Sequence, residues 1–412
     1  MDKKPEKLVP EVRFKGFTDD WEQHKLEEIA EFYNGDRGPN YPKPSEIVEQ
    51  GVPFINAGDL INGHIDYRNC KHITSDKFNQ LNGAKLKIND IVYCLRGTIG
   101  KNGLVNSDAN ATIASSLVCI RPVKLRPLFL FQILNSSIEE RQRKMVDEGA
   151  AQPNISATNL KKFLIPVPND NEQEKIGEVF SKLNHLITLQ QRKLEQLKQL
   201  KKALLQQLFV GKNNKQPNLR FKNFDGEWEQ CMLKEIKDVR DGTHNSPRYQ
   251  KEGYPLVTSK NLITNGIDLS NVSFISKYDY QEINKRSKVE TGDILFGMIG
   301  TIGNPVMVKK GGFAIKNVAL IKNGGEVSNG FLLHLLKSAI FSQYIKKENA
   351  GGTQKFLGLS VIRSFKFKVP DKVEQGNIAS IFDTLNRFIT LQQNKLTQLT
   401  TLKKYLLQKL FI

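Results

Sequence analysis

Apolar and polar residues follow two different patterns along the chain, and each pattern occurs twice. From Ile176 and again from Ile378, apolar side chains recur at alternating spacings of four and three. This spacing predicts long helices with the seam of a coiled coil. Before each long helix, short apolar runs such as DIVYCL and DILFGMI are separated by Gly, Asn and Pro, which predicts strands and turns. Helical patterns appear late in each of these stretches, so we expect two α+β bodies.

The two long helices have recognisable starts. Asn169 with Glu172, and Asp371 with Glu374, have the spacing of a helix N-cap and its capping-box partner. Gly211 is placed to end the first helix. The seams are formed by Ile176, Phe180, Leu183, Ile187, Leu194 and Leu197, and by Ile378, Phe382, Leu385, Ile389, Leu396 and Leu399. Gln190 and Gln392 also fall on the seam, where each could fix the register or be a tolerated polar neighbour.

The repeated patterns belong to one duplicated unit. ITLQQRKLEQLKQLKKALLQQLF and ITLQQNKLTQLTTLKKYLLQKLF agree at 17 of 23 positions. PEVRFKGFTDDWEQHKLEEI matches PNLRFKNFDGEWEQCMLKEI, and NDIVYCLRGTIGK matches GDILFGMIGTIGN. The predicted parts are a first body over 1–168, a helix over 169–211, a linker over 212–219, a second body over 220–370 and a helix over 371–412.

Two helices with apolar seams bury those seams most simply against each other. If the duplication preserves a pseudo-twofold axis, the helices run antiparallel and form a spacer with one body at each end. About 39 helical residues extend roughly 58 Å at 1.5 Å per residue. The predicted fold class is therefore α+β, with two pseudo-repeated domains joined by an antiparallel coiled coil.

Composition narrows the class of protein. The chain has 412 residues, 39% of them apolar, and no apolar run approaches the roughly 18 residues that span a bilayer. Its charged first residues do not resemble a signal peptide, so we expect a cytoplasmic protein without a membrane partner. The four cysteines are scattered, which argues against a disulfide framework. His64, Cys70 and His72 lie close in sequence, but an ordinary loop explains them better than a metal site.

The charge suggests a polyanionic partner. Lys and Arg number 61 against 43 Asp and Glu, which gives a formal charge of +18. Nucleic acid is the commonest partner of so basic a protein. Sites on one face of duplex DNA recur about every 34–36 Å, a spacing that two heads on a rod could match. The bodies differ more than the helices do, and Arg96 has Ile299 at its place in the second copy. This contrast predicts that the heads read different sequences.

Four segments form an ordered set of motifs, namely DGTHNSPRYQKEGYPLVTSKNL after Val239, RGTIGK at Arg96, GGTQKFLGLS at Gly351 and LQQRKLEQLKQLKKALLQQLF. This ordered set resembles the specificity subunit of type I restriction–modification systems. The resemblance covers almost the whole chain. It implies that each body is a target-recognition domain for one half of a split DNA sequence, and that the helices set the unread spacer.

The resemblance also implies partners. Two methyltransferase subunits would dock on the helices, bring S-adenosylmethionine and flip the target adenine, and restriction subunits would bring ATP-driven translocation and cleavage with Mg²⁺. No cofactor is expected on this chain itself. It has no G-x-x-x-x-G-K-[ST] phosphate loop and no Asn-Pro-Pro-Tyr or Asp-Pro-Pro-Tyr segment. PDKVEQ lacks the acidic-x-Lys strand of a nuclease. Two alternatives are a self-contained enzyme with an unfamiliar site and a coiled-coil adaptor with only nonspecific DNA affinity.

The candidate DNA contacts are polar loop residues, because bases are read by Arg, Lys, Asn and Gln while most polar contacts go to phosphate. In the first body they are Asp36, Arg37, Asn40, Tyr41, Arg96, Lys101, Gln152 and Asn154. In the second they are Thr243, His244, Asn245, Arg248, Tyr249, Lys260, Asn261, Thr353, Gln354 and Lys355. Solvated surface loops are the alternative interpretation of each.

Other prominent residues are expected to serve the fold. Four glycines, Gly97, Gly100, Gly300 and Gly303, are expected to shape turns. Trp21 and Trp228 are expected in the cores. Four helix lysines, Lys201, Lys202, Lys403 and Lys404, could face phosphate or partner subunits, but a solvated helix face is favoured. The sequence does not spell out the recognised bases or the spacer length.

Overall fold

The computed structural model describes residues 9–146, 154–211, 214–264, 266–348 and 356–411. The chain divides into two compact units. Unit 1 is residues 1–191 with 394–412, and unit 2 is residues 192–393. Each unit therefore contains one predicted body, the first part of the long helix that follows that body, and the last part of the other long helix.

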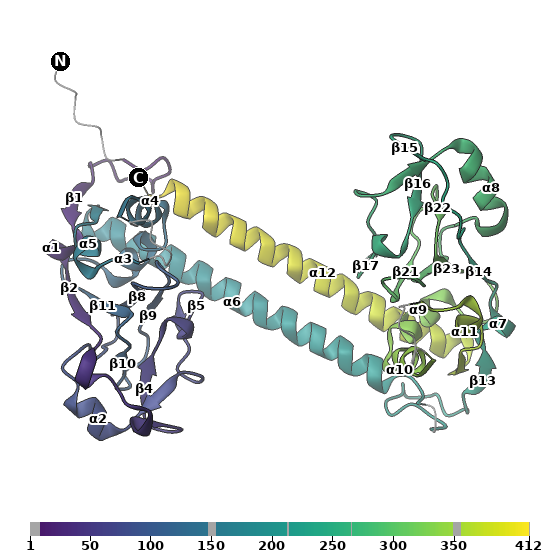
Figure 1. Ribbon diagram of the computed structural model, residues 1–412, viewed down its shortest axis with the longest axis horizontal. Coiled ribbons are helices and arrows are strands. Elements are labelled where there is room, and N and C mark those ends of the chain that lie inside the picture. The colour runs from purple at the N-terminus through teal and green to yellow at the C-terminus, as the bar shows by residue number, and fades with distance from the viewer. Residues whose placement is uncertain (1–8, 147–153, 212–213, 265, 349–355, 412) are drawn as a thin grey trace, which may run out of the picture. The chain divides into compact units, whose positions relative to one another are not determined.

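Unit 1 begins with a body of short strands and helices (Figure 1). Its strands are β1 (Glu22–Lys25), β2 (Ala30–Asn34), β3 (Ile47–Val48), β4 (Val52–Ile55), β5 (Leu60–Ile61), β6 (His64–Ile65), β7 (Lys71–Ile73), β8 (Ile91–Cys94), β9 (Asn102–Leu104), β10 (Thr112–Ile113), β11 (Leu117–Pro122) and β12 (Leu164–Val167). Its helices are α1 (Leu26–Ile29), α2 (Ser75–Gln80), α3 (Pro127–Ile133), α4 (Ser137–Val146), α5 (Ala157–Lys161) and the long α6 (Asp170–Gln207), which continues into unit 2.

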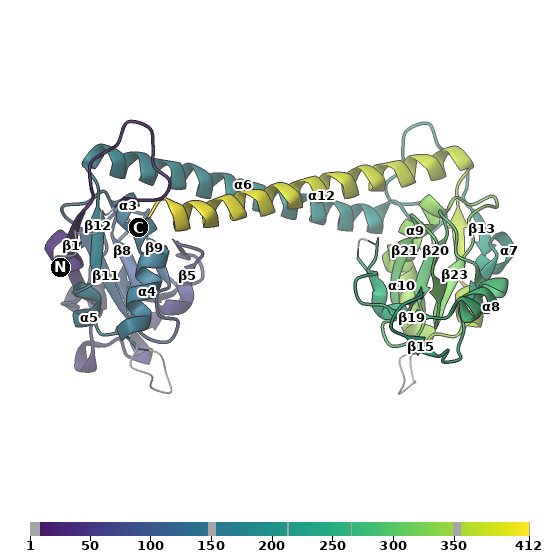
Figure 2. The same ribbon diagram turned by 90° about the horizontal axis from the view of Figure 1, so that it is seen from above.

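Two four-stranded sheets form the body of unit 1. One has the order β2-β11-β8-β9, and the other has the order β10-β4-β7-β3 with β10 and β4 parallel. The predicted strand DIVYCL forms β8 and is buried on both faces, since successive side chains point to opposite sides. Ile91 and Tyr93 pack with α3 and the start of α6, whereas Val92 and Cys94 pack with residues of the second sheet. Figure 2 shows α3 between the first sheet and α6.

Unit 2 repeats this topology. Its strands are β13 (Glu229–Met232), β14 (Val239–Asp241), β15 (Tyr249–Gln250), β16 (Tyr254–Val257), β17 (Leu262–Ile263), β18 (Gly266–Ile267), β19 (Ser273–Ile275), β20 (Ile294–Gly297), β21 (Gly303–Met307), β22 (Ala314–Ile315), β23 (Val318–Ile321) and β24 (Lys366–Val369). Its helices are α7 (Leu233–Ile236), α8 (Lys277–Ser287), α9 (Asn329–Lys337), α10 (Ala339–Glu348), α11 (Leu359–Arg363) and the long α12 (Lys372–Lys409), which continues into unit 1. The sheet order β14-β23-β20-β21 corresponds strand by strand to β2-β11-β8-β9 of unit 1, and the order β22-β16-β19-β15 corresponds to β10-β4-β7-β3. The predicted duplication is confirmed.

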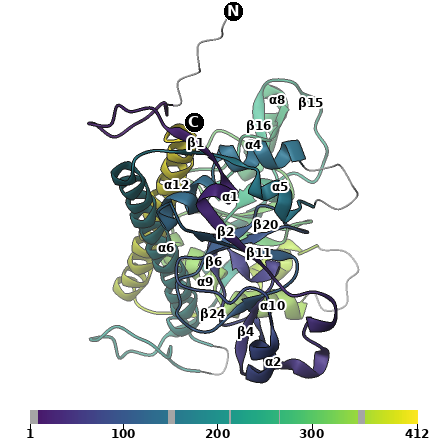
Figure 3. The same ribbon diagram turned by 90° about the vertical axis from the view of Figure 1, so that its left-hand side faces the viewer.

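The long helices run antiparallel, as predicted. In unit 1 the ring of Phe411, just after α12, stacks on Phe180 near the start of α6 with 5.9 Å between ring centres. In unit 2 the ring of Phe209, just after α6, stacks on Phe382 near the start of α12 at 6.0 Å. Figure 3 faces unit 1 and shows the two helices side by side there. The α+β class with an antiparallel helix pair is thus confirmed.

Both helices begin at the predicted caps. Oδ1 of Asn169 accepts the amide of Glu172 at 3.0 Å, and Oδ1 of Asp371 accepts the amide of Glu374 at 2.9 Å. The glutamates do not complete a capping box, however. The buried carboxylate of Glu172 takes two hydrogen bonds from Arg13 at 2.7 and 2.8 Å. Arg220 binds Glu374 in the same way, so each pair ties the entry segment of a body to its helix.

The helices end earlier than the predicted limits of 211 and 412. After Gln207 the chain leaves the helix because Leu208, Phe209 and Val210 enter the core of unit 2, where each is at least 94% buried. After Lys409, Leu410 and Phe411 enter the core of unit 1 in the same way. The first helix therefore ends at Gln207, four residues before Gly211, and Gly211 does not end it as predicted.

Several residues predicted to serve the fold have clear places in it. Trp21 and Trp228 are buried in the two cores, as predicted. Lys202 and Lys404 are exposed, but Lys201 and Lys403 are half-buried, and burial lowers their pKa. The expected solvated face was wrong for those two lysines.

The seam glutamines also have buried atoms. The side-chain oxygens of Gln190 and Gln392 are buried, and within the described ranges neither has a hydrogen-bond partner. Their role in register stays a prediction.

Candidate nucleic-acid interface

The loop that joins β14 to β15 in unit 2 carries four of the predicted DNA contacts, Thr243, His244, Asn245 and Arg248, and a fifth, Tyr249, is the first residue of β15. Backbone hydrogen bonds fix its first residue. The amide of Thr243 donates to the carbonyl of Ile315 at 3.0 Å, and the amide of Asn317 donates to the carbonyl of Thr243 at 3.1 Å. Gly242 is needed here, because a Cβ would lie 2.3 Å from the Ile315 carbonyl oxygen. The loop therefore leaves the sheet in a defined direction.

His244 is held by two side chains of the fold. Its Nδ1 lies 2.9 Å from Oδ1 of Asn317, and its Nε2 lies 2.8 Å from Oδ2 of Asp241. Asn317 has a left-handed backbone with a φ of 56°, a conformation that asparagine tolerates better than most residues. Because both ring nitrogens of His244 are engaged, one exposed edge of the ring has a fixed orientation.

The tip of the same loop presents charged and aromatic groups to solvent. Nζ of Lys316 donates to Oγ of Ser246 at 2.7 Å and lies 3.3 Å from the hydroxyl of Tyr249. Tyr249 is 56% exposed, and Arg248 and Asn245 are exposed as well. Within the described part of the chain, the guanidinium of Arg248 makes no hydrogen bond or ion pair. Arg248 is therefore able to contact a ligand without giving up a partner.

A second segment meets this loop at Asn317. Oγ of Ser259 donates to the Asn317 carbonyl at 3.2 Å, and the amide of Met298 is 3.4 Å from the same oxygen. Lys260 follows Ser259 and is exposed. We call Asn317 and the three segments around it, residues 242–249, 259–261 and 298–303, the unit 2 junction. It brings Lys260 to the loop of His244 and Arg248.

Asn261 serves the fold of the junction. It is 7% exposed, and its Oδ1 accepts from both the amide and the hydroxyl of Thr258 at 2.9 Å. Its Nδ2 donates to the carbonyls of Asp268 and Asn271 at 3.2 and 3.1 Å. All of its amide groups are in use, so Asn261 is left out of the interface proposed below.

The glycine turns that follow β8 and β20 have the predicted shape. Gly97 and Gly100 have φ values of 83° and 82°, and Gly300 and Gly303 have φ values of 74° and 108°. Residues with a Cβ rarely adopt this region, so the glycines are required by the backbone. Their predicted role in shaping the turns is confirmed.

In unit 1 the glycine turn presents two candidate contacts. Arg96 and Lys101 are exposed, and Arg96 forms a β-bridge with the exposed Asn154. The amide of Ile155 donates to the carbonyl of Leu95 at 3.0 Å, which fixes Asn154 beside the turn. In unit 2 the bridge joins Ile299 to Phe356 instead. The predicted contacts Gln152, Thr353, Gln354 and Lys355 lie outside the described residues.

The long loop of unit 1 is only partly joined to this turn. Nη2 of Arg37 donates to the carbonyl of Ser115 at 3.4 Å. The amide of Leu95 donates to the carbonyl of Ser116 at 2.9 Å. Arg37 and the residue before Arg96 therefore contact neighbouring serines, and we call Arg37, Arg96, Ser115, Ser116 and Asn154 the unit 1 junction.

The other three loop residues have different places. Asp36 accepts the amides of Asn82 and Gly83 at 3.3 and 2.7 Å, which binds its carboxylate to a neighbouring turn. Asp36 is therefore also left out of the proposed interface. Asn40 and Tyr41 are exposed, and the Tyr41 ring packs edge-on to Phe54 at 5.6 Å.

Sequence reasoning missed a polar network beneath the unit 1 turn. The Tyr93 hydroxyl and Nε of Arg143 both donate to Oε1 of Glu139, at 2.5 and 2.7 Å. Glu139 is 5% exposed, and burial raises its pKa. A Cβ on Gly100 would lie 2.7 Å from Nε of Arg143, so the guanidinium touches the turn. The sequence contains one sign of this network, because the second copy has Phe296, which lacks a hydroxyl, at the place of Tyr93.

The described ranges contain no candidate metal site, because no three His, Cys, Asp or Glu side chains in them are grouped so that they could hold a metal ion. Cys70 donates to the carbonyl of Tyr67 at 3.4 Å. In the same ranges, no helix has the length and apolar character needed to cross a bilayer.

The two repeated bodies, each with its junction and long helix, define a duplicated recognition module, and comparison with known proteins identifies its family. The model of the Type I restriction modification DNA specificity domain matches residues 18–199 and again residues 225–401. The chain belongs to this family and carries two tandem DNA specificity domains.

Relatives of similar length support the assignment. The type I restriction enzyme MjaVIII specificity subunit of Methanocaldococcus jannaschii is 21% identical over 426 residues, which cover 93% of this chain and 96% of the relative. The putative MjaX specificity subunit of the same organism is 23% identical over 415 residues, covering 95% and 93%. The crystal structure of the type I restriction-modification S subunit from M. genitalium has a TM-score of 0.65 at 18% identity, over 98% of this chain and 99% of that one. This structural likeness shows a shared fold.

Proposed function

We propose that each unit reads one half of a split target on double-stranded DNA through its junction. One observation carries the proposal: the two units share a fold but differ in side chains at the same places. Arg37 and Arg96 of unit 1 correspond to His244 and Ile299 of unit 2. Arg37 and Arg96 can donate to base edges, whereas both ring nitrogens of His244 are engaged within the fold and Ile299 offers only apolar contact, so the two sets favour different bases. The net charge of +18 supports a DNA partner.

The helices supply the second part of the proposal, which is a docking surface for two methyltransferase subunits. Exposed apolar side chains occur at matching positions of both helices. Leu186, Leu189 and Leu200 on α6 correspond to Phe388, Leu391 and Leu402 on α12, and all are 44–55% exposed. Leu186 with Leu189, and Phe388 with Leu391, are i,i+3 neighbours on the helix surface. Repeated apolar pairs of this kind favour two copies of one partner.

The chemistry would then come from the partners. The methyltransferase subunits would bring S-adenosylmethionine and modify the target adenine, and restriction subunits would bring ATP and Mg²⁺ for translocation and cleavage. This chain would contribute recognition and spacing in the cytoplasm, with no cofactor of its own.

Selection from random duplexes tests the recognition proposal. The full chain, assembled with its methyltransferase subunits, is used to enrich DNA from a random pool at physiological salt. We expect a split motif with a spacer of fixed length, and each wrong base pair should weaken binding by about 1–3 kcal/mol. Salt-sensitive binding without an enriched motif would overturn the proposal and favour the adaptor with nonspecific DNA affinity.

A further inference from the structure

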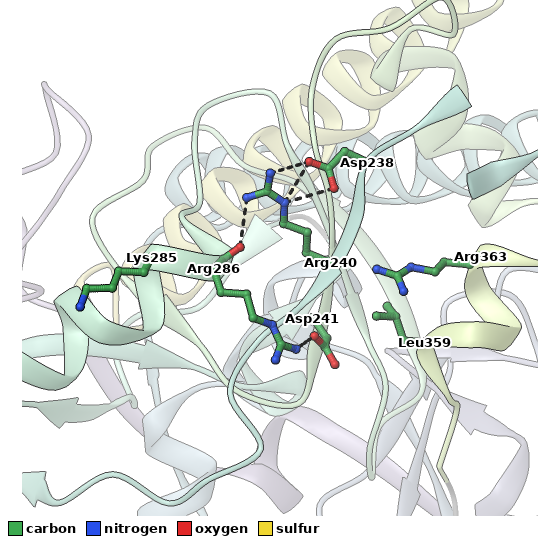
Figure 4. A pocket seen from close by; sticks show the side chains of 7 residues that line it. All are labelled: Asp238, Arg240, Asp241, Lys285, Arg286, Leu359 and Arg363. Carbon is green, nitrogen blue, oxygen red and sulfur yellow. Dashed lines mark hydrogen bonds and ion pairs between the residues drawn. The ribbon is translucent and has the colours of Figure 1, made fainter. Parts of the chain in front are cut away.

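A basic cavity lies beside the unit 2 junction (Figure 4). It has a volume of about 600 Å³ and is formed by residues of β14, α8 and α11 and by Asp238 just before β14. Its charged lining consists of four cations, Arg240, Lys285, Arg286 and Arg363, and two carboxylates, Asp238 and Asp241. Cations outnumber carboxylates, so the cavity favours an anionic ligand.

Asp241 joins this cavity to the junction. Its Oδ2 accepts a hydrogen bond from Nε2 of His244 at 2.8 Å, whereas its Oδ1 forms an ion pair with Nη2 of Arg286. The same carboxylate therefore orients one candidate base contact and one cavity arginine. A DNA strand that reaches His244 would lie close to the cavity.

The arginines are held in place but keep donors for a ligand. Arg363 donates from Nε and Nη2 to the carbonyl of Val239, at 3.0 and 2.5 Å. Arg286 is 64% exposed and uses Nη2 for Asp241. In the described part of the chain, Nη1 of Arg363 and Nη1 of Arg286 have no hydrogen-bond partner. Figure 4 shows the two side chains extending towards Asp241 from α11 and from α8.

Arg240 is more fully engaged. Its Nε and Nη2 bind the carboxylate of Asp238 at 2.6–3.1 Å, and its Nη1 donates to the carbonyl of Arg286 at 3.0 Å. This last bond holds the end of α8 against β14. Arg240 is therefore a positioning residue that fixes Arg286 beside the cavity.

Unit 1 does not repeat this arrangement. Tyr33 stands at the place of Arg240, and its hydroxyl donates to Glu31 at 2.6 Å. Lys161 stands at the place of Arg363, and its amino group lies over the Phe32 ring at 5.4 Å from the ring centre. The two units thus differ in cationic groups as well as in their junctions.

We propose that Arg286 and Arg363 form a clamp for the phosphodiester backbone of double-stranded DNA, flanking the half-site that unit 2 reads. The inference rests on the proposed function and deepens it, because it assigns a backbone contact to unit 2 alone. Planar guanidinium groups suit phosphate oxygens, and such contacts position DNA without selecting sequence. The clamp therefore raises affinity for all sequences equally.

The test is the salt dependence of DNA binding by the chain assembled with its methyltransferase subunits, on a duplex that carries the selected motif. The Arg286→Ala/Arg363→Ala variant should lower the slope of log affinity against log salt by about 2, with the motif unchanged. Lys372→Ala removes an exposed charge at the start of α12 and is the control for net charge. Arg286→Ala alone, with a slope lower by about 1, keeps the test valid if loss of Arg363 impairs folding.

A second arm locates the contact. Trimming the duplex outside the unit 2 half-site should weaken binding by the wild-type complex and leave the double variant unaffected. An unchanged slope, with the motif still recognised, would overturn the clamp while leaving the proposed function intact. Absence of any motif-specific binding would overturn both.

Discussion

The hydroxyl of Tyr93 donates a hydrogen bond of 2.5 Å to Glu139, which is buried beneath the glycine turn of unit 1. Unit 2 has Phe296 and Phe341 at these two places, with edge-to-face rings 5.3 Å apart. The two units therefore support the same turn in different ways. Unit 1 uses a polar network that ends at Arg143, and unit 2 uses an aromatic pair.

Removing the carboxylate should destabilise unit 1. Glu139→Ala leaves the Tyr93 hydroxyl and Arg143 without their shared partner, which should cost about 3 kcal/mol of unfolding free energy. The chain has two tryptophans, one in each core, so Trp228→Phe leaves Trp21 as a fluorescence probe of unit 1. Urea unfolding in that background measures the loss.

The neighbouring residue provides a matched control. Glu140 is exposed and pairs with Lys144 on the same helix. Glu140→Ala should leave the unfolding of unit 1 nearly unchanged. Equal losses in the two variants would contradict the role assigned to the Tyr93–Glu139–Arg143 network.

Burial of Glu139 also predicts a pH dependence. Its pKa is raised by burial, so the folded chain takes up this proton at a higher pH than the unfolded chain. Between the ordinary glutamate pKa and the raised folded value, the stability contributed by this group falls as pH rises. Glu139→Gln should remove that part of the slope in Trp21-monitored unfolding. A slope that persists unchanged in the variant would refute the assignment.

Lys337 predicts the opposite trend in unit 2. Burial, with a smaller effect of Lys201, lowers its pKa to about 8. From about pH 8 to about pH 10 the unfolded chain binds this proton and the folded chain does not, so stability contributed by this group rises with pH. In a Trp21→Phe background, unfolding monitored by Trp228 should show this rise, and Lys337→Met should reduce it. Identical profiles for the two chains would exclude the effect.

The docking proposal predicts a change in stoichiometry. Leu186→Glu with Leu189→Glu places two charges on the exposed apolar surface of α6 in unit 1, while Phe388 and Leu391 stay intact on α12. Size exclusion with light scattering should show one methyltransferase subunit per chain instead of two. The exposed control Gln191→Glu should still bind two. Two subunits on the double variant would show that the apolar pair is not a docking surface.

Much of this fold is predictable from the sequence because its signals are local. The four-three spacing of apolar residues, the caps at Asn169 and Asp371, and the uninterrupted apolar run of β8 each depend on neighbours within a few residues. The duplication then assigns every element of one body to its counterpart in the other. The helix pair follows from two seams that need burial.

The parts that could not be predicted depend on distant partners. Glu172 looked like half of a capping box, but its carboxylate binds Arg13, 159 positions earlier. Asn261 looked like a base contact, but its amide is buried against the carbonyls of Asp268 and Asn271. Arg286 and Arg363 were not candidates, because only the packing of α8 and α11 beside β14 brings them together. The composition of a loop identifies polar residues, but it does not show which of them already make hydrogen bonds within the fold.

The most direct test of the central claim is a map of methyladenine in genomic DNA from cells that express the chain with its companion methyltransferase. Cells that lack the chain are the baseline, and an Arg248→Ala variant is mapped in parallel. We predict a new split motif with methyladenine in both halves, and a relaxed or lost half-site on one side only in the variant. No new motif, with the methyltransferase active beside another specificity chain, would contradict the account. An unchanged motif in the variant would contradict the assignment of Arg248.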